Sequence, residues 1–411
     1  MHASNLIFFT FSLQLLLAAA SLGAQSLYDS IPLHAYPFSQ EIREKMASGQ
    51  EYVSRIAEQF SYIGRYDEAL RVPNDPDWEW GFDTMSANQR AYFERFHPVD
   101  AVGYLLEKAA SEQILILNEA HHKPQHRIFT RQLLRGLYEQ GYRYFGLEAV
   151  NNNPFDTTGL LLDTALQRRG YPLNSPITGT YVREPQMGLL IREAIETGFT
   201  IFAYERHRRG DRELIQAGNI HHRILKENPE ARILIHCGWY HLLEQENEGW
   251  KWMATHLKEM TGIDPLTVYQ DILTERYAMK ESPYYRMIDE ENPVVFVDET
   301  GQAFNGPPGF GKFDVLLYHP RTRYVYNRPD WLLSIPENRL FHPDREQIRV
   351  GYPCQILAYK QSEPDEAVPM DVIELEHPAD PTALVLPPGD YRLLIRDITG
   401  AEQILAVTIE K

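Results

Sequence analysis

Between Gln113 and Gln270 the chain alternates short apolar runs with amphipathic segments, and this pattern restricts the folds open to it. The apolar runs are ILILN (114–118), YRYFGLE (142–148), FTIFAYE (199–205) and ARILIHC (231–237). Helix-like segments lie between them, over residues 126–141, 186–198 and 211–227. Strands that alternate with helices favour parallel pairing through right-handed crossovers. We therefore predict an α/β fold with a mainly parallel sheet flanked by helices.

The segments before and after this region differ from it in composition and in the pattern of apolar residues. Residues 27–112 are rich in aromatic and charged side chains, with helix-like stretches at 41–60 and 87–110 and no obvious strand. They predict a helical N-terminal extension of an α/β domain that spans residues 27–345, in which residues 151–184 are a loop-like insert. Residues 353–411 alternate apolar and polar side chains across turn signals at 387–389 and 399–400, which indicates a small all-β module. The alternative is a β-extension of the main sheet.

The first residues are typical of a secretory signal peptide. An apolar run from Leu6 to Ala20 is followed by small residues, and no charged side chain precedes Asp29. We predict a signal peptide over residues 1–24, cut after Ala24 or near Ala20, and hence a secreted or periplasmic protein. An uncleaved membrane anchor is the alternative, although the run is short for a span of about 20 residues.

Charge and cysteine content exclude several classes of function. The formal net charge is -17, with 57 acidic and 40 basic residues, and the absence of a basic block argues against nucleic acid and anionic lipid as partners. With Cys237 and Cys354 alone, the chain is no disulfide scaffold, and the sequence does not tell whether the two thiols bridge. It also contains no G-x-S-x-G elbow, P-loop or dinucleotide fingerprint.

The densest group of ionisable residues follows the first apolar run. Glu119, His121, His122 and His126 come where the strand ends, which is the edge at which α/β proteins place their binding sites. Carboxylate and imidazole suit either a divalent metal or proton transfer near neutral pH. On an extended chain His121 shares a side with Glu119 and His122 faces the other side. For His122 or His126 the alternative is a helix cap or a surface position.

Glu148, Glu205 and His241 follow the other strands. YFGLE resembles IFAYE and ILILNEAHH resembles RILIHCGWYH, so a repeated strand pair would bring these residues and Glu119 to one crevice. The alternative is that short apolar strands resemble one another by composition. We expect the pKa of Glu148 to be disturbed, as in a general base, or Glu148 to pair with Arg212.

Two further inferences concern the last of these strands and the helix before it. Gly238 permits a close backbone approach before His241, and His236 is expected to be a core residue. His221 and His222 lie on adjacent faces of a helix, so they cannot both point at one ion.

Several motifs together resemble the erythromycin esterase and ChaN-like superfamily. They are LNEAHHKPQHRIFTRQLL, YFGLE, RELIQAGN (212–219), HCGWYHL and GKFDVLLYHPRT with Asp314, within residues 113–323. The resemblance implies an α/β fold with a repeated half. It implies site residues Glu119, Glu148, Arg212 and His241, together with His122 on the esterase pattern E-x-x-H or His121 on the ChaN pattern E-x-H. Asn118 and Gln216 depart from the usual glycine and methionine.

That superfamily contains hydrolases that open macrolide esters, a metal-dependent protease of the TIKI type and haem-binding ChaN-like proteins. The leading hypothesis is therefore a secreted or periplasmic hydrolase of ester, lactone or peptide bonds. His121 or His122, oriented by Glu119 or Glu148, would activate water, and Arg212 and His241 would stabilise the oxyanion. A divalent metal bound by Glu119, His121, Glu148 and His241 could activate the water instead.

Two other functions compete with hydrolysis. The first is a haem- or metal-binding protein without turnover, in which Tyr240 or His241 supplies the axial ligand. The second is a protein that contacts a surface or a partner through the C-terminal β-module while its cleft is idle. The natural substrate and the oligomeric state are not encoded in any motif that we recognise.

Overall fold

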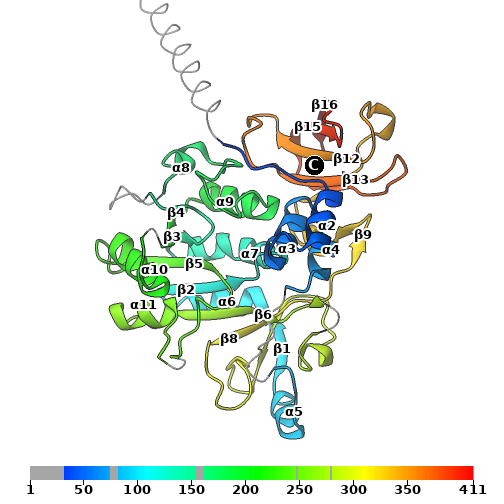
Figure 1. Cartoon of the computed structure of the whole chain (residues 1–411). Helices are drawn as coiled ribbons and strands as arrows, with labels where there is room; N and C mark the ends of the chain where they lie inside the picture. Colours follow the sequence, from blue (N-terminus) through cyan, green and yellow to red (C-terminus); the bar gives the residue numbers. More distant parts are fainter. Residues whose placement is uncertain are drawn as a thin grey trace, which may run out of the picture.

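An eight-stranded, mostly parallel sheet forms the centre of the computed structural model (Figure 1). The structure describes residues 32–74, 82–153, 161–206, 208–246, 249–277 and 280–410, so the predicted signal peptide (1–24) lies outside the described residues. The strand order is β1-β7-β8-β6-β2-β5-β3-β4. Every pair from β8 to β4 is parallel, whereas β1–β7 and β7–β8 are antiparallel. The predicted fold class is confirmed. The strands are β1 (His97–Asp100), β2 (Ile114–Glu119), β3 (Tyr142–Leu147), β4 (Thr200–Ala203), β5 (Arg232–Gly238), β6 (Leu266–Leu273), β7 (Val294–Val297) and β8 (Val315–Tyr318).

Helices cover both faces of this sheet, which explains why its central strands β2, β5, β6, β7 and β8 are buried over nearly their whole length. On one face α6 (Ala101–Ala109), α7 (Gln125–Glu139) and α9 (Pro185–Thr197) pack against side chains such as Leu115, Phe145 and Leu234. On the other face α10 (Arg212–Ile220), π-helix η1 (His221–Leu225) and α11 (Met253–Thr261) pack against Ile116 and Ile235. The buried central strands therefore present their chemistry at their ends.

The N-terminal extension differs from its sequence-based description in two ways. The stretch 41–60 is two helices, α2 (Ser39–Ser48) and α3 (Val53–Tyr62), because Gly49 ends the first in the left-handed region. The stretch 87–110 is α5 (Ala87–Phe93), strand β1 and α6, so a strand occurs where none was predicted. Strand β1 forms through pairing with β7, a long-range partner that local periodicity does not reveal.

The C-terminal residues form antiparallel sheets separate from the main sheet, as expected for an all-β module. The larger one has the order β13-β12-β15-β16. Its strands are β12 (Cys354–Lys360), β13 (Asp371–Leu375), β15 (Gly389–Asp397) and β16 (Glu402–Ile409), while β14 (Leu384–Leu386) pairs with β11 (Arg339–Phe341), and β9 (Tyr324–Val325) pairs with β10 (Arg328–Pro329).

The N-terminal helices pack on this β-module. Ile42, Phe60 and Ala69, from α2, α3 and α4 (Tyr66–Arg71), share a core with Leu357 and Val372. Figure 1 shows these helices against β12 and β13. The described residues of the insert, 151–153 and 161–184, are loop-like, as predicted, apart from the short α8 (Leu166–Arg169).

Two further findings concern membranes and thiols. Within the described ranges, no helix has both the length and the apolar character needed to cross a bilayer. Cys237 and Cys354 are both buried free thiols.

Candidate active site

The candidate site lies at the edge where β2, β3 and β5 end. In the parallel register Glu119 pairs with Gly238, and Leu147, one residue before Glu148, pairs with His236. The ends of adjacent parallel strands share one edge of a sheet. The structure thus brings the two glutamates together with the segment that leads to His241, as the sequence predicted.

Glu119 is buried and fully engaged by neighbouring side chains. Its Oε2 accepts from Arg127 Nε at 2.6 Å, and its Oε1 accepts from Arg127 Nη2 at 2.6 Å. His121 Nδ1 lies 2.8 Å from Oε1 and His236 Nε2 lies 2.8 Å from Oε2. Burial alone would raise the pKa of Glu119, but Arg127 and these hydrogen bonds hold it well below its usual range. Glu119 is therefore an ionised acceptor that orients its neighbours.

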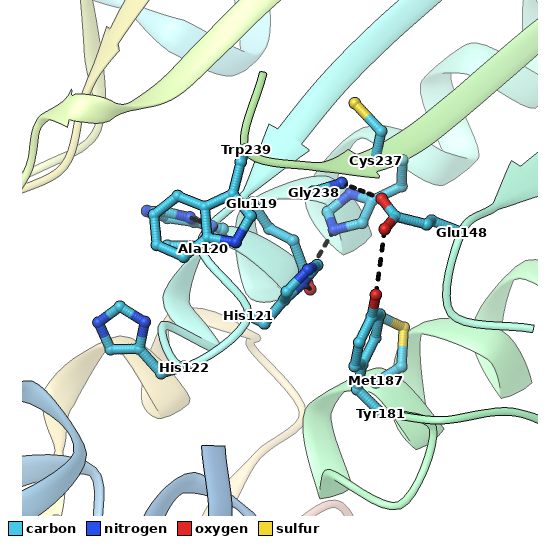
Figure 2. Close-up of polar contacts among 12 residues, drawn as sticks. Glu119, Ala120, His121, His122, Glu148, Tyr181, Met187, Cys237, Gly238 and Trp239 are labelled. Carbon is cyan, nitrogen blue, oxygen red and sulfur yellow. Dashed lines mark hydrogen bonds and ion pairs between the residues drawn. The ribbon is translucent and has the colours of Figure 1, made fainter. Parts of the chain in front are cut away.

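The structure distinguishes the two adjacent histidines. His121 lies between Glu119 and Tyr181, on whose ring it stacks with centroids 4.1 Å apart, whereas His122 points away from Glu148 (Figure 2). His122 instead has Nδ1 3.2 Å from Asn74 Nδ2. Burial opposes a charge on His121, but the hydrogen bond with Glu119 and the charges of Glu119 and Glu148 raise its pKa. The geometry thus favours His121, the residue that the ChaN pattern matches.

Gly238 makes the close approach of these groups sterically possible. A Cβ at this position would lie 2.4 Å from His121 Cε1, 2.6 Å from His121 Nε2 and 3.1 Å from Glu148 Oε2. The next residue, Trp239, has a φ of 46°, and its N–H donates to the Glu119 carbonyl at 2.9 Å. Nε2 of His121 and the Glu148 carboxylate therefore meet over a backbone that only glycine accommodates.

Glu148 is surrounded by donors, which disturb its pKa in the direction that makes it a weaker base. Gly238 N donates to its Oε2 at 2.5 Å and Tyr181 Oη to its Oε1 at 3.1 Å (Figure 2). Arg212 Nη2 donates to the same oxygen as Tyr181, at 2.8 Å. Burial would raise its pKa, but His241, His121, Arg212 and the Gly238 N–H lower it to about 2. A carboxylate with so low a pKa is a weak base and supplies fixed negative charge.

Arg212 joins the two acidic residues that follow β3 and β4. Its guanidinium contacts Glu148 and also Glu205, to which Nε donates at 3.1 Å. Gln216 Nε2 donates to the same carboxylate at 2.9 Å. Burial would lower the pKa of Arg212, but the hydrogen bond with Glu205 and the negative charges of Glu148 and Glu205 raise it. The expected Glu148–Arg212 pair is thus present, and Glu205 shares it.

His241 completes the group around Glu148. Its Nε2 lies 3.7 Å from Glu148 Oε1, and its Nδ1 lies 2.7 Å from Glu213 Oε2. The side chains of His121, Glu148 and His241 are 11%, 4% and 7% exposed. Those of Arg212 and Glu205 are 38% and 24% exposed. Solvent therefore reaches this group mainly from the Arg212 side.

The tentative metal site is not supported by the side-chain arrangement. The proposed ligands were Glu119, His121, Glu148 and His241, but both oxygens of Glu119 accept hydrogen bonds from Arg127. Among the described residues, no three His, Cys, Asp or Glu side chains gather as a metal ion requires. For haem, Tyr240 was the alternative ligand. Its ring packs against Trp252 and Tyr269, with centroids 5.6 and 6.4 Å away.

His126 and His236 are both core residues. The sequence groups His126 with the ionisable residues after the first strand, with a helix cap or a surface position as the alternative; in the structure it is buried, its Nδ1 accepts from the Ala120 N–H at 3.1 Å, and its ring stacks on His319. Burial lowers the pKa of His126 well below its usual value. His236 is a satisfied core histidine, as expected, between Glu119 and Thr130.

Three site residues were missed by the sequence analysis. Arg127 lies in the first turn of α7, Tyr181 in the loop-like insert and Glu213 in the first turn of α10. Each looks like an ordinary helix or loop residue, and no spacing rule connects it to the strand ends. The available signal was proximity, since Glu213 follows Arg212 and Arg127 follows the histidine cluster.

Comparison with known proteins gives little further information. No family model matches the chain, and no curated protein matches it. Among solved structures, one described as bacterial protein toxins has a TM-score of 0.32 and 12% identity, over 52% of this chain and 45% of that chain. The type III effector HopBA1 has a TM-score of 0.28 and 12% identity, over 43% of this chain and 86% of that chain. RRSP, a MARTX toxin effector domain from Vibrio vulnificus, has a TM-score of 0.26 and 14% identity, over 64% of this chain and 49% of that chain.

This chain thus spans about half the length of the first and third of these proteins.

Proposed function

We propose that this protein is a hydrolase of ester, lactone or peptide bonds in which His121 is the general base. The observation that carries the proposal is the Glu119–His121 pair, with a distance of 2.8 Å between Oε1 and Nδ1. Because Glu119 is ionised, it can only accept a hydrogen bond, so Nδ1 of His121 carries the proton. In neutral His121 the free lone pair is then on Nε2, next to Gly238 and Glu148.

The reaction follows from this arrangement. His121 Nε2 takes a proton from water as the oxygen attacks the carbonyl carbon, and the carbonyl electron pair moves to its oxygen. Arg212 and doubly protonated His241, whose Nε2–H is then available to donate, stabilise the negative charge that develops there. When the tetrahedral intermediate collapses, the bond to the leaving group breaks and the proton on His121 passes to that group. Ionised Glu148 holds Arg212 in place and favours the protonated form of His121 during the reaction.

The proposal keeps two further expectations from the sequence. The apolar N-terminal run indicates export, so we place the activity in the periplasm or outside the cell. The motifs that resemble the erythromycin esterase and ChaN-like superfamily fit a hydrolytic site built on Glu119, Glu148, Arg212 and His241.

A matched pair of variants tests this function. His121→Gln and His122→Gln alter adjacent residues, one inside the group around Glu148 and the other pointing away from it (Figure 2). On a panel of 4-nitrophenyl esters, lactones and short peptides, His121→Gln is expected to lower kcat by roughly 10²- to 10⁴-fold. His122→Gln is expected to stay within a few-fold of the unmodified protein. No turnover on the whole panel, or equal losses in both variants, would refute the assignment.

A further inference from the structure

Glu213 holds a position that no sequence motif assigned. It is buried in the first turn of α10, directly after Arg212. Its Oε2 lies 2.7 Å from His241 Nδ1 and accepts from the backbone N–H of Met253 at 3.0 Å. Met253 is the first residue of α11, so this carboxylate lies at the N-terminal ends of two helices. Positive helix ends favour a negative charge at such a position.

The contacts of Glu213 fix the direction of the hydrogen bond. Oε2 accepts from a backbone N–H and lies at the N-terminal ends of two helices, which favour the ionised carboxylate, and an ionised carboxylate can only accept. The second group at the same oxygen, His241 Nδ1, must then be the donor. In neutral His241 the remaining lone pair is on Nε2, which faces Glu148 at 3.7 Å. In doubly protonated His241, Nδ1–H donates to Glu213 and Nε2–H points toward Glu148.

We propose that Glu213 is a positioning residue that orients His241 so that Nε2 faces the reacting atoms. Glu213 holds Nδ1 of His241 as Glu119 holds Nδ1 of His121. Nε2 of each histidine is thereby directed toward the carboxylate of Glu148. The pairs differ in their surroundings, since Glu119 is shared with Arg127 whereas Glu213 is held by a backbone N–H. The role in turnover rests on the proposed function, but the orientation of the ring does not.

The orientation can be measured without any substrate. In protein labelled with ¹⁵N-histidine, the two ring nitrogens of a neutral imidazole have distinct shifts, and a His241→Gln variant assigns the signals. We expect the neutral form of His241 to carry its proton on Nδ1. Glu213→Ala removes the acceptor, so the Nε2–H form should become populated. Glu213→Gln keeps an oxygen that can accept from Met253 N–H and Nδ1–H, so it should retain the Nδ1–H form.

Turnover provides the second readout. With the best 4-nitrophenyl ester, Glu213→Ala is expected to lower kcat roughly 10²- to 10⁴-fold with little change in KM. The variant misorients the His241 ring in the transition state but does not weaken binding of the substrate. Glu193→Ala, on the partly exposed end of a contact with Arg131, is the control and should match the unmodified protein in both readouts.

The outcomes are separable. An Nε2–H tautomer in the unmodified protein overturns the proposal, even if Glu213→Ala does not fold. If His241 is the Nδ1–H tautomer but no substrate is hydrolysed, the proposed orientation of His241 is supported and the proposed hydrolase function is refuted. An unchanged kcat in folded Glu213→Ala, with hydrolysis present, overturns the positioning role.

Discussion

Replacing Glu244 with glutamine is expected to stabilise this protein at neutral and alkaline pH. The Thr267 hydroxyl lies 2.6 Å from Glu244 Oε1 and 3.1 Å from Asp314 Oδ2, and it also accepts from the Asp314 N–H. One hydroxyl proton cannot satisfy two carboxylates, so the pair gains by binding one additional proton. Lys258 Nζ lies 3.2 Å from Glu244 but is also 2.5 Å from Asp264. The positive charge of Lys258 is therefore shared between Glu244 and Asp264.

The size of the effect follows from the pKa of Glu244. Burial and the neighbouring Asp314 raise this pKa from 4.5 to about 7. Below pH 4.5 Glu244 is protonated in both the folded and the unfolded chain, so its ionisation does not affect the free energy of unfolding. Between pH 4.5 and 7 the unfolded chain releases the proton while the folded chain keeps it, so stability falls as pH rises. At about 1.4 kcal/mol for each pKa unit, the full loss would be about 3 kcal/mol, and solvent screening reduces it to about 1 to 2 kcal/mol.

Urea unfolding from about pH 4.5 to 8.5 measures this difference directly. Glutamine keeps an oxygen for Thr267 but cannot ionise, so Glu244→Gln should match the unmodified protein at the acidic end and exceed it by about 1 to 2 kcal/mol at the alkaline end. The control is Glu259→Gln on the exposed face of α11, where Glu259 contacts Lys251. A variant that is less stable than the parent at alkaline pH, or a difference that does not change with pH, would refute the shared-proton explanation.

Four other outcomes are expected. The kcat/KM of hydrolysis should rise with pH and reach half its plateau above pH 6.5, because the base must lose its proton and the pKa of His121 is raised; a half-maximum below that pH argues against His121. Gly238→Ala should lower kcat roughly 10²-fold and cost about 1 to 3 kcal/mol in urea, since its Cβ would overlap the His121 ring. Arg127→Met should cost about 3 to 5 kcal/mol, since it leaves Glu119 buried without its cation. Iodoacetamide should label Cys237 and Cys354 only after unfolding, because burial raises both thiol pKa values, that of Cys354 to about 12; mass spectrometry of the native protein checks this.

The parallel half of the fold could be predicted because its signals are local. The runs at 114–118 and 231–237 consist mostly of apolar residues without the alternation of a half-exposed strand, which is the pattern of a strand covered on both faces, and the structure has β2 and β5 there. Polar residues that follow such runs fall at one sheet edge by geometry, so Glu119, Glu148 and His241 could be grouped from the sequence. Strand β1 could not, because its four residues become a strand only through pairing with β7, about 200 residues later.

The finer chemistry of the site depends on neighbours that the sequence does not connect. A glutamate after a strand reads equally well as a base or as an ion-pair partner, and the choice depends on how many donors reach it. Glu148 receives three, from the loop at Tyr181, from α10 through Arg212 and from the end of β5 at Gly238. None of these three was close to it along the chain, so the direction of its pKa shift could not be read in advance.

The low pKa of Glu148 also determines where protons are held in this site. A carboxylate that stays ionised down to about pH 2 cannot carry a proton between substrate and water at neutral pH. Glu119 is excluded for the same reason, because Arg127 keeps it ionised. Proton transfer therefore falls to the imidazoles, and of the described histidines at this edge, His121 and His241 are those that flank Glu148. For Nε2 of each ring to transfer protons, Nδ1 must hold the ring in place. This requirement accounts for the two buried glutamates, Glu119 at Nδ1 of His121 and Glu213 at Nδ1 of His241.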